Sequence, residues 1–381
     1  MESKWETILL KDICDYKTGR LNSNAAEDDG IYPFFTCSPE VFKISTYAFD
    51  QDAVILGGNN ANGKFPLKRY EGKFNAYQRT YVMASKNNDI IDNTYLYYYL
   101  LYKLNYLKNL SIGSATKFLT KTILDRLEIN YPRDNHQMRL IGQILAKIDS
   151  KISLNQDIIS NLEHLAQTLF KHWFINFEFP NEQGQPYKSS GGEMVESELG
   201  EIPTGWQVKC LEDVFSLKRG YDLPVSKREE GLIPIVSSSG VNGYHNVAKG
   251  HGPGVITGRS GKLGNVFYIK EDYWPLNTTL YVEDFKNNNP IYIYFLMKTL
   301  DFESLNAGSS VPTLNRNHVH KLKVVSSKKE LVEKFGTLVD PIFEKKDSLI
   351  KEIEVLNKVR DTLLPKLLSG GIKISGNLEV E

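Results

Sequence analysis

The chain of 381 residues has only three cysteines, Cys14, Cys37 and Cys210, and none of them forms a C-x-x-C pair. An odd number of thiols without that spacing argues against a disulfide framework and against a cysteine zinc site. No apolar run approaches the roughly 18 residues that a membrane-spanning helix needs, and the first ten residues do not resemble a signal peptide. We therefore expect a cytoplasmic protein with no membrane partner.

The sequence also lacks net charge, because 46 Lys and Arg residues balance 46 Asp and Glu residues. A nucleic-acid-binding protein often has a basic excess, so any such contact has to use local basic surfaces here. Hydrophobic residues make up 41% of the chain and aromatic residues 11%. This composition is typical of a folded protein and excludes extensive disorder.

An internal repeat runs through the chain at an offset of 201 residues. The aligned pairs include Trp5 with Trp206, Asp12 with Asp213, Gly19 with Gly220, Gly57 with Gly258 and Gly63 with Gly264. The offset then drifts, and we align Tyr81-Val82 with Tyr281-Val282. Chance similarity of two β-rich segments would not keep one offset over so many separate matches, so we infer a duplication.

Each copy begins with short β-branched and aromatic runs, which predict strands, followed by the helical patterns Asn93–Lys108 and Pro290–Leu300. The predicted fold class is α+β, with two small mixed domains joined by two long helices. The predicted parts are residues 1–133 (first small domain), 134–176 (first long helix), 177–204 (extended acidic linker rich in Gly, Pro and Ser), 205–327 (second small domain), 328–370 (second long helix) and 371–381 (tail).

Both long helices show an apolar repeat of three and four residues, which predicts a coiled-coil seam. Polar residues interrupt the seam at Asn155, Lys346 and Arg360, where they cost stability and are expected to fix the register, although Arg360 near the helix end is equally consistent with simple tolerance. Pro341 predicts a break or kink. The predicted seam residues are Ile141, Leu145, Ile148, Ile152, Asn155, Ile159, Leu162, Leu169, Val339, Ile342, Leu349, Ile353, Leu356 and Leu363.

Catalytic motifs are scarce. Gly58–Lys64 has the spacing of a phosphate-binding loop, but Phe65 follows where that loop needs Ser or Thr to hold magnesium. His318 and His320 lie two apart in a predicted strand, without a third ligand nearby, so we predict no metal site. The sequence therefore predicts a chain that catalyses no reaction by itself and binds no cofactor.

Several strings together resemble the specificity subunit of type I restriction-modification enzymes over the whole chain. They are Glu198–Trp206 (ELGEIPTGW), Leu169–Phe174 (LFKHWF), the Gly-Ser and Leu patterns of Gly113–Leu119 and Gly308–Leu314, and Leu363–Gly370 (LLPKLLSG). The resemblance implies two target recognition domains, each of which reads one half of a split double-stranded DNA sequence. It also implies that the two helices pack antiparallel as a pseudo-twofold spacer, which docks two methyltransferase subunits.

By the same resemblance, S-adenosylmethionine is expected on the methyltransferase partners and ATP on separate motor-nuclease restriction subunits. Two other hypotheses stay open. One is a scaffold paralogue that only assembles partner subunits, and the other is an NTP-using enzyme at Gly58–Lys64.

The candidate DNA contacts are polar residues on predicted turns, at comparable places in the two copies. In the first copy they are Lys17, Arg20, Ser38, Asn59, Asn60, Asn62, Lys64, Tyr77, Gln78, Arg79 and Lys117. In the second copy they are Lys218, Arg219, Tyr221, Ser237, Ser238, Ser239, Arg259, Ser260, Lys262, Asn277, Thr278 and Arg316.

Overall fold

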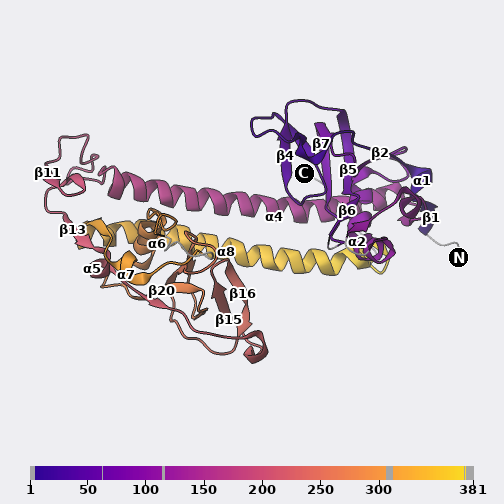
Figure 1. Ribbon diagram of the computed structural model, residues 1–381. Helices are drawn as coiled ribbons and strands as arrows, with labels where there is room; N and C mark the ends of the chain where they lie inside the picture. Colours follow the sequence, from indigo (N-terminus) through magenta and orange to yellow (C-terminus); the bar gives the residue numbers. More distant parts are fainter. Residues whose placement is uncertain (1–4, 62, 114–115, 306–311, 373, 375–381) are drawn as a thin grey trace. The chain divides into compact units, whose positions relative to one another are not determined.

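In the computed structural model the chain divides into two compact units, each containing one small domain and parts of both long helices (Figure 1). Unit 1 comprises residues 1–156 and 351–381, and unit 2 comprises residues 157–350. The structure describes residues 5–61, 63–113, 116–305, 312–372 and 374. We call the small domain of unit 1 domain 1 and that of unit 2 domain 2.

Domain 1 is built on a mixed sheet with the order β2-β8-β5-β7-β3-β4, in which β3 and β7 are parallel and the other neighbours antiparallel. Its strands are β2 (Cys14–Thr18), β3 (Tyr32–Phe35), β4 (Val41–Ile44), β5 (Phe49–Gly57), β7 (Leu67–Ala76) and β8 (Thr80–Ser85). Two smaller ladders pair β1 (Trp5–Leu9) with β10 (Glu128–Pro132) and β6 (Asn59–Asn60) with β9 (Lys117–Phe118). The helices are α1 (Leu10–Ile13), α2 (Asn93–Leu110) and α3 (Lys121–Asp125).

Domain 2 repeats this plan, with a sheet β14-β20-β17-β18 and a second sheet β16-β15-β19. The strands are β14 (Ser216–Arg219), β15 (Ile233–Ser237), β16 (Gly240–His245), β17 (Gly254–Gly258), β18 (Val266–Ile269), β19 (Trp274–Pro275) and β20 (Thr279–Asp284). A further ladder pairs β13 (Gln207–Cys210) with β21 (Lys323–Ser326). The helices are α5 (Leu211–Val214), α6 (Pro290–Lys298) and α7 (Arg316–His320).

The two domains share their strand order, except that the single strand β7 of domain 1 corresponds to β18 and β19 of domain 2, and this confirms the predicted fold class and the duplication. The pairs β2-β8-β5 and β14-β20-β17 have the same order, and the parallel contact of β3 with β7 recurs between β15 and β19. The ladders correct one alignment, because Ile55 lies opposite Val82 whereas Ile256 lies opposite Tyr281. The equivalent of Tyr281 is therefore Val82 rather than Tyr81, and the offset in this strand is 199 residues.

Three other expectations are wrong. His318 and His320 lie on α7 and not on a strand. The predicted linker is not extended, since β11 (Met194–Ser197) pairs with β12 (Gly200–Pro203) and the Phe179 ring stacks on Tyr187 and Trp206. Pro341 does not break α8 (Lys329–Leu368), because the helix is held on both sides of the proline by buried neighbours such as Val339 and Phe343.

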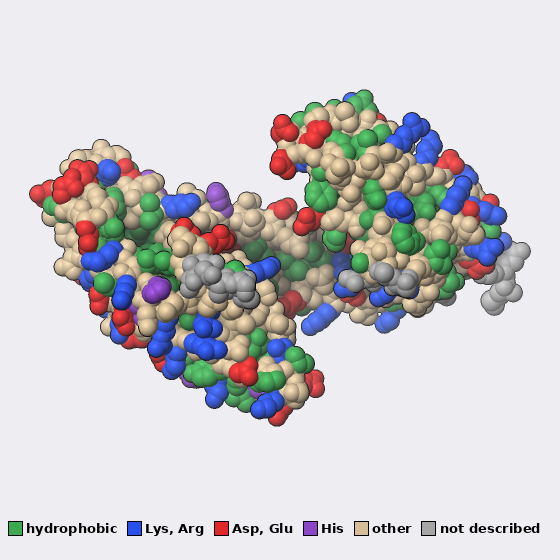
Figure 2. Space-filling view, viewed as in Figure 1, with side chains coloured by type: hydrophobic (Ala, Val, Ile, Leu, Met, Phe, Trp, Pro, Cys, Tyr) green, Lys and Arg blue, Asp and Glu red, His purple; other side chains and the backbone are tan. Residues whose placement is uncertain are grey.

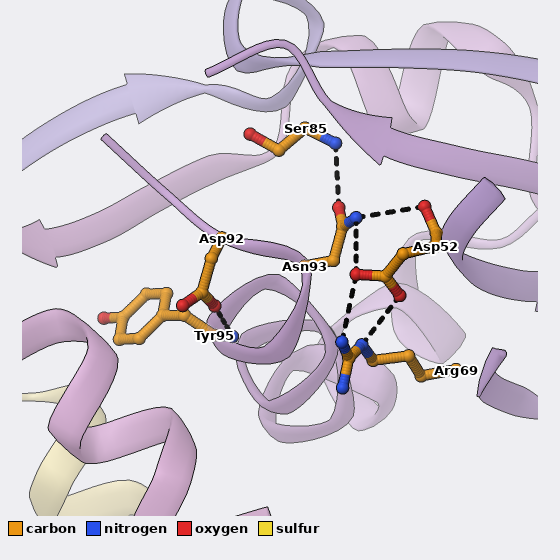
Figure 3. Close-up of polar contacts among 6 residues, drawn as sticks. All are labelled: Asp52, Arg69, Ser85, Asp92, Asn93 and Tyr95. Atoms are coloured by element: carbon orange, nitrogen blue, oxygen red, sulfur yellow. Dashed lines mark hydrogen bonds and ion pairs between the residues drawn. The ribbon is translucent and has the colours of Figure 1, made fainter. Parts of the chain in front are cut away.

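A polar cluster fastens the start of α2 to the sheet of domain 1 (Figure 3). The buried Asn93 side chain accepts a hydrogen bond from the Ser85 amide at 2.8 Å and donates to the Asp52 carbonyl at 3.0 Å. Arg69 binds the Asp52 carboxylate through two nitrogen atoms, at 2.9 and 3.0 Å. Asp92 caps α2 by accepting from the Tyr95 amide at 2.7 Å. These bonds from three strands set where α2 crosses the sheet.

The long helices complete the core of unit 1. The first part of α4 (Asn135–Phe170) contributes Ile141 and Leu145, and the last part of α8 contributes Leu364 and Leu367. All four residues pack in one cluster with buried tyrosines of α2, among them Tyr95. The two helices run antiparallel here, and Arg360 of α8 donates to Asp149 of α4 at 2.9 Å. Tyr98 of α2 donates to the same carboxylate at 2.8 Å.

Unit 2 uses the other parts of the same helices. Phe170 of α4 and Phe335 of α8 pack edge to face within the core that also buries α6. Glu163 of α4 accepts from Lys346 of α8 at 2.7 Å and from Lys298 of α6 at 2.8 Å. A tyrosine of α6 also donates to this carboxylate, at 2.7 Å. In each unit, therefore, a carboxylate on α4 joins the domain helix to a cation on α8.

All the predicted seam residues are buried or half-buried. Asn155 is fully buried, and neither polar atom of its side chain has a hydrogen-bond partner among the described residues. Lys346 and Arg360, in contrast, both bind carboxylates of α4. The two charged seam positions thus favour the observed pairing of α4 with α8, whereas Asn155 only costs stability.

Glu163→Gln should lower the melting temperature of the protein, because two ammonium groups would lose the carboxylate that they share. We expect the free energy of unfolding to fall by about 2 kcal/mol. This is less than the loss on breaking a fully buried ion pair, because Glu163 is partly solvated. Thermal unfolding at pH 7 measures the effect. The matched control is Glu333→Gln, which removes an exposed carboxylate from α8 in the same unit. Equal shifts for both variants would contradict the role of Glu163.

The same contribution should depend on pH. Burial raises the pKa of Glu163, but the hydrogen bonds from Lys298, Lys346 and Tyr294 outweigh that effect and lower the pKa to about 2. A carboxylate with a depressed pKa stabilises the fold above its unfolded-state value of about 4.3, and this stabilisation is lost as the pH falls towards 2. The difference in melting temperature between wild type and Glu163→Gln should shrink over that range.

Candidate nucleic-acid interface

In domain 1, segments far apart in the sequence meet at one end of the main sheet. The turn before β8 donates from the Gln78 amide to the Leu21 carbonyl at 2.9 Å, which ties it to the loop after β2. The Gly58 amide donates to the Arg79 carbonyl at 2.8 Å, and the Leu119 amide donates to the Gly58 carbonyl at 2.8 Å. These contacts join residues 19–22, 58–61, 63–64, 77–79 and 117–119, which we call the loop end of domain 1.

Domain 2 has a similar arrangement, in which two of these backbone hydrogen bonds recur at equivalent positions. The Arg259 amide donates to the Thr278 carbonyl at 2.8 Å, and the Leu314 amide donates to the Arg259 carbonyl at 2.8 Å. The loop after β14 is held through Tyr221, whose amide donates to the Pro275 carbonyl at 2.8 Å. Residues 219–222, 258–262, 276–278 and 312–314 therefore form the loop end of domain 2.

One glycine in each domain permits this close packing. A Cβ atom on Gly19 would lie 1.8 Å from the Ala76 carbonyl oxygen, and a Cβ atom on Gly220 would lie 2.2 Å from the Leu276 carbonyl oxygen. Any side chain there would push the loop away from the turn. The two glycines therefore position the neighbouring polar residues Arg20, Arg219 and Tyr221 at the loop ends.

The loop ends bring together most of the predicted DNA contacts. In domain 1 these residues are Arg20, Asn59, Asn60, Lys64, Tyr77, Gln78, Arg79 and Lys117. In domain 2 they are Arg219, Tyr221, Arg259, Ser260, Lys262, Asn277 and Thr278, with Ser238 close to Gly258 and Gly261. Asn62 lies outside the described residues, as do Ser114, Gly308 and Ser309 of the repeated Gly-Ser pattern.

The remaining candidates are occupied by local structure or lie beyond the loop ends. Lys218 binds Glu283, and the hydroxyl groups of Ser237 and Ser239 hydrogen-bond to each other in the turn between β15 and β16. The Ser38 hydroxyl accepts from the Glu40 amide within a turn. Lys17 is exposed on the last part of β2. Arg316 begins α7, so its structural equivalent is Lys121, the first residue of α3.

Sequence reasoning missed Lys108. This residue lies in the last turn of α2, and its Cγ atom would be 3.0 Å from a Cβ atom built on Gly63. The Cγ atom of Lys117 would be 3.4 Å from the same point, and Lys64 is the next residue in the chain. Three lysines, Lys64, Lys108 and Lys117, thus lie next to Gly63 in the chain or in space. No sequence signal marks Lys108, because 45 residues separate it from Gly63 and only the fold joins them.

Arginine side chains at the loop ends have no acidic partner among the described residues. Arg79 lies over the Phe118 ring, with its guanidinium carbon 5.4 Å from the ring centre. Burial lowers the pKa of Arg259, and the positive charge of Arg219 lowers it further. Two buried polar atoms, Asn59 Oδ1 and Thr278 Oγ1, also have no hydrogen-bond partner in the described part of the chain. Cations and polar atoms without protein partners are suited to an anionic, hydrogen-bonding ligand.

The geometry offers little for catalysis. Lys64 is followed by strand β7, whereas the lysine of a phosphate-binding loop begins a helix. Among the described residues, no group of three or more His, Cys, Asp or Glu side chains is placed to ligate a metal. None of the helices in the described part of the chain has the length and apolarity that a membrane crossing requires.

A family model described as the type I restriction modification DNA specificity domain matches residues 2–164 and 203–336. The chain belongs to this family. The two matched segments correspond to the two copies of the repeat, and each contains one loop end. The recognition that the sequence suggested is therefore confirmed, and specificity in this family concerns DNA.

Two curated relatives of this chain are specificity subunits of type I restriction enzymes. The EcoDI specificity subunit of Escherichia coli is 31% identical over 224 residues, covering 56% of this chain and 49% of that protein. The MjaIX specificity subunit of Methanocaldococcus jannaschii is 28% identical over 364 residues, covering 89% and 80%. The match to EcoDI thus spans about half of that relative's length. Both relatives are specificity subunits, which supports the prediction of a non-catalytic chain.

The fold also has a solved counterpart. The crystal structure of the S subunit of a type I restriction-modification system from M. genitalium superimposes with a TM-score of 0.66 at 19% identity, covering 97% of both chains. At this identity the likeness concerns the fold alone.

Lys108→Ala should weaken binding of duplex DNA by the assembled complex to a similar degree for all sequences. An ammonium group that contacts a phosphate releases about one counterion on binding, so the slope of log K against log salt should become less steep by about 1. Fluorescence anisotropy over a salt series measures the slope. The matched control is Lys351→Ala, an exposed lysine of α8. An unchanged slope for Lys108→Ala would contradict its place in the interface.

Proposed function

We propose that this chain is the DNA-reading subunit of a type I restriction-modification complex, in which each domain reads one half of a bipartite target. The observation that carries the proposal is the recurrence of one loop end in both domains, with two backbone hydrogen bonds at equivalent positions and different polar side chains. A constant frame with variable polar groups is what two sites of one kind need when they recognise different base sequences.

The long helices are proposed to set the distance between the half-sites. At a rise of 1.5 Å per residue, the 36 residues of α4 span about 54 Å and the 40 residues of α8 about 60 Å. Both helices belong to the cores of both units, and the carboxylates Asp149 and Glu163 tie them to α2 and α6. A pseudo-twofold arrangement of the two copies would match the dyad symmetry of duplex DNA.

The helices also provide surface for partner subunits. Leu154 and Leu165 of α4 and Leu338, Val355 and Val359 of α8 are 40% to 58% exposed. Large apolar side chains on long helices are suited to contacts with another protein. We propose that two methyltransferase subunits dock on these helices and use S-adenosylmethionine to methylate adenine at N6, and that motor-nuclease restriction subunits use ATP. The complex is expected to act in the cytoplasm, and this chain itself carries no cofactor.

A map of N6-methyladenine over the genome tests the proposal. The chain is expressed in a host together with its methyltransferase partner, and the control is the partner alone. We expect a new split motif, with methylated adenines on opposite strands of its two halves. Assembly of the complex is checked by size-exclusion chromatography. An assembled complex that produces no motif would exclude the DNA-reading function and favour a scaffold that only assembles partners.

A further inference from the structure

The loop ends of the two domains differ in where they carry an arginine. In domain 1 the Gly58 amide donates to the Arg79 carbonyl, and in domain 2 the Arg259 amide donates to the Thr278 carbonyl, both at 2.8 Å. The donor is therefore glycine in one domain and arginine in the other. The acceptor is arginine in one and threonine in the other. Each domain therefore has one arginine at this hydrogen bond. In domain 1 it directly precedes β8, and in domain 2 it directly follows β17.

The equivalence of these positions rests on the backbone and not on sequence similarity. The carbonyl of the donor residue accepts from Leu119 in domain 1 and from Leu314 in domain 2, again at 2.8 Å in both. The strand ladders agree, because Gly57 lies opposite Thr80 and Gly258 lies opposite Thr279. Arg79 directly precedes Thr80 in domain 1, and Arg259 directly follows Gly258 in domain 2.

Domain 1 has a steric reason to take its arginine from the turn. A Cβ atom on Gly58 would lie 2.5 Å from the Arg79 carbonyl oxygen and 3.0 Å from the Tyr81 ring. That ring is held in place by a hydrogen bond from its hydroxyl to the Leu119 carbonyl at 3.0 Å. In domain 2 the smaller Leu280 occupies the position of Tyr81, and Arg259 is accommodated on the strand end.

Both guanidinium groups lie beside other parts of the loop end, and none of the described acidic side chains neutralises them. Arg79 lies over the face of Phe118, and Arg259 is half-buried beside Arg219. Neither makes an ion pair with any described residue. The neighbouring lysines 64, 108 and 117 are flexible point charges, which suit phosphates. A planar guanidinium instead suits a pair of acceptors in one plane, and guanine presents O6 and N7 in this way in the major groove.

We propose that Arg79 and Arg259 are the residues that each read a guanine in the half-site of their own domain. This inference rests on the proposed function, and it assigns one base type and one residue to each half of the target.

The test uses the full chain assembled with its methyltransferase partner and compares N6-methyladenine motifs between variants. In Arg259→Ala one guanine position in one half-site should accept other bases, with discrimination reduced on the order of 10-fold to 100-fold. Arg79→Ala should do the same in the other half-site only. Arg259→Lys keeps the charge but not the paired donors, so it should relax the same position and also guards against loss of folding.

The matched controls are Lys64→Ala and Lys262→Ala, which should lower methylation at all sites alike and leave both half-sites unchanged. The inference is overturned if the wild-type half-sites contain no guanine, or if the arginine variants lower methylation evenly like the lysine controls. It is also overturned if those variants leave the motif intact. Failure of the proposed function looks different, because the wild-type chain would then give no split motif at all.

Discussion

Neither small domain buries its helix without the long helices, and this constraint governs the whole architecture. In unit 1 the tyrosines of α2 are covered by Ile141 and Leu145 of α4 together with the last turns of α8. In unit 2 the apolar α6 is covered by Phe170 of α4 and Phe335 of α8. Each long helix therefore serves two cores. A repeat of domain and helix has to be present twice, with the helices antiparallel, before either core is complete.

The charges on the helices follow from that constraint. Asp149 and Glu163 lie where a domain helix meets both long helices, and each carboxylate accepts from a tyrosine and from a cation of α8. Apart from the exposed pair of Lys151 with Glu352, the acids that join the two long helices lie on α4 and the cations on α8. This polarity favours pairing of α4 with α8 over pairing of either helix with its own copy, because like charges or unpaired half-buried charges would result.

Much of this structure was predictable from the sequence, because the repeat, the strands and the apolar seams are patterns of local periodicity. The exceptions have physical causes. The alignment of Tyr81 with Tyr281 was wrong because it matched identical residues. The strand register shows instead that Tyr281 is equivalent to Val82, since they lie opposite the equivalent residues Ile256 and Ile55. The segment 177–204 looked like a linker, since its composition gives no sign that Phe179 stacks on Trp206. Lys108 was missed because its neighbour Gly63 is distant in the sequence.

The different positions of the arginines in the two loop ends could not be predicted from the sequence either, because only the backbone hydrogen bonds show which positions are equivalent. Arg79 and Arg259 do not align in the sequence, yet they lie on the two sides of equivalent hydrogen bonds. A frame built from backbone hydrogen bonds tolerates such exchanges, because it depends on glycines at close approaches and not on the reading side chains. The candidate residues could be predicted as polar turn residues, but their pairing across strands needed coordinates.

Each domain is proposed to read its own half-site through an equivalent backbone frame. The most direct test replaces residues 205–327 with a second copy of residues 1–133 and maps N6-methyladenine for the resulting chain with its methyltransferase partner. We expect a palindromic split motif, in which the half-site of domain 1 appears twice in inverted orientation. A motif that retains the half-site of domain 2, or an assembled complex that methylates no split motif, would contradict it.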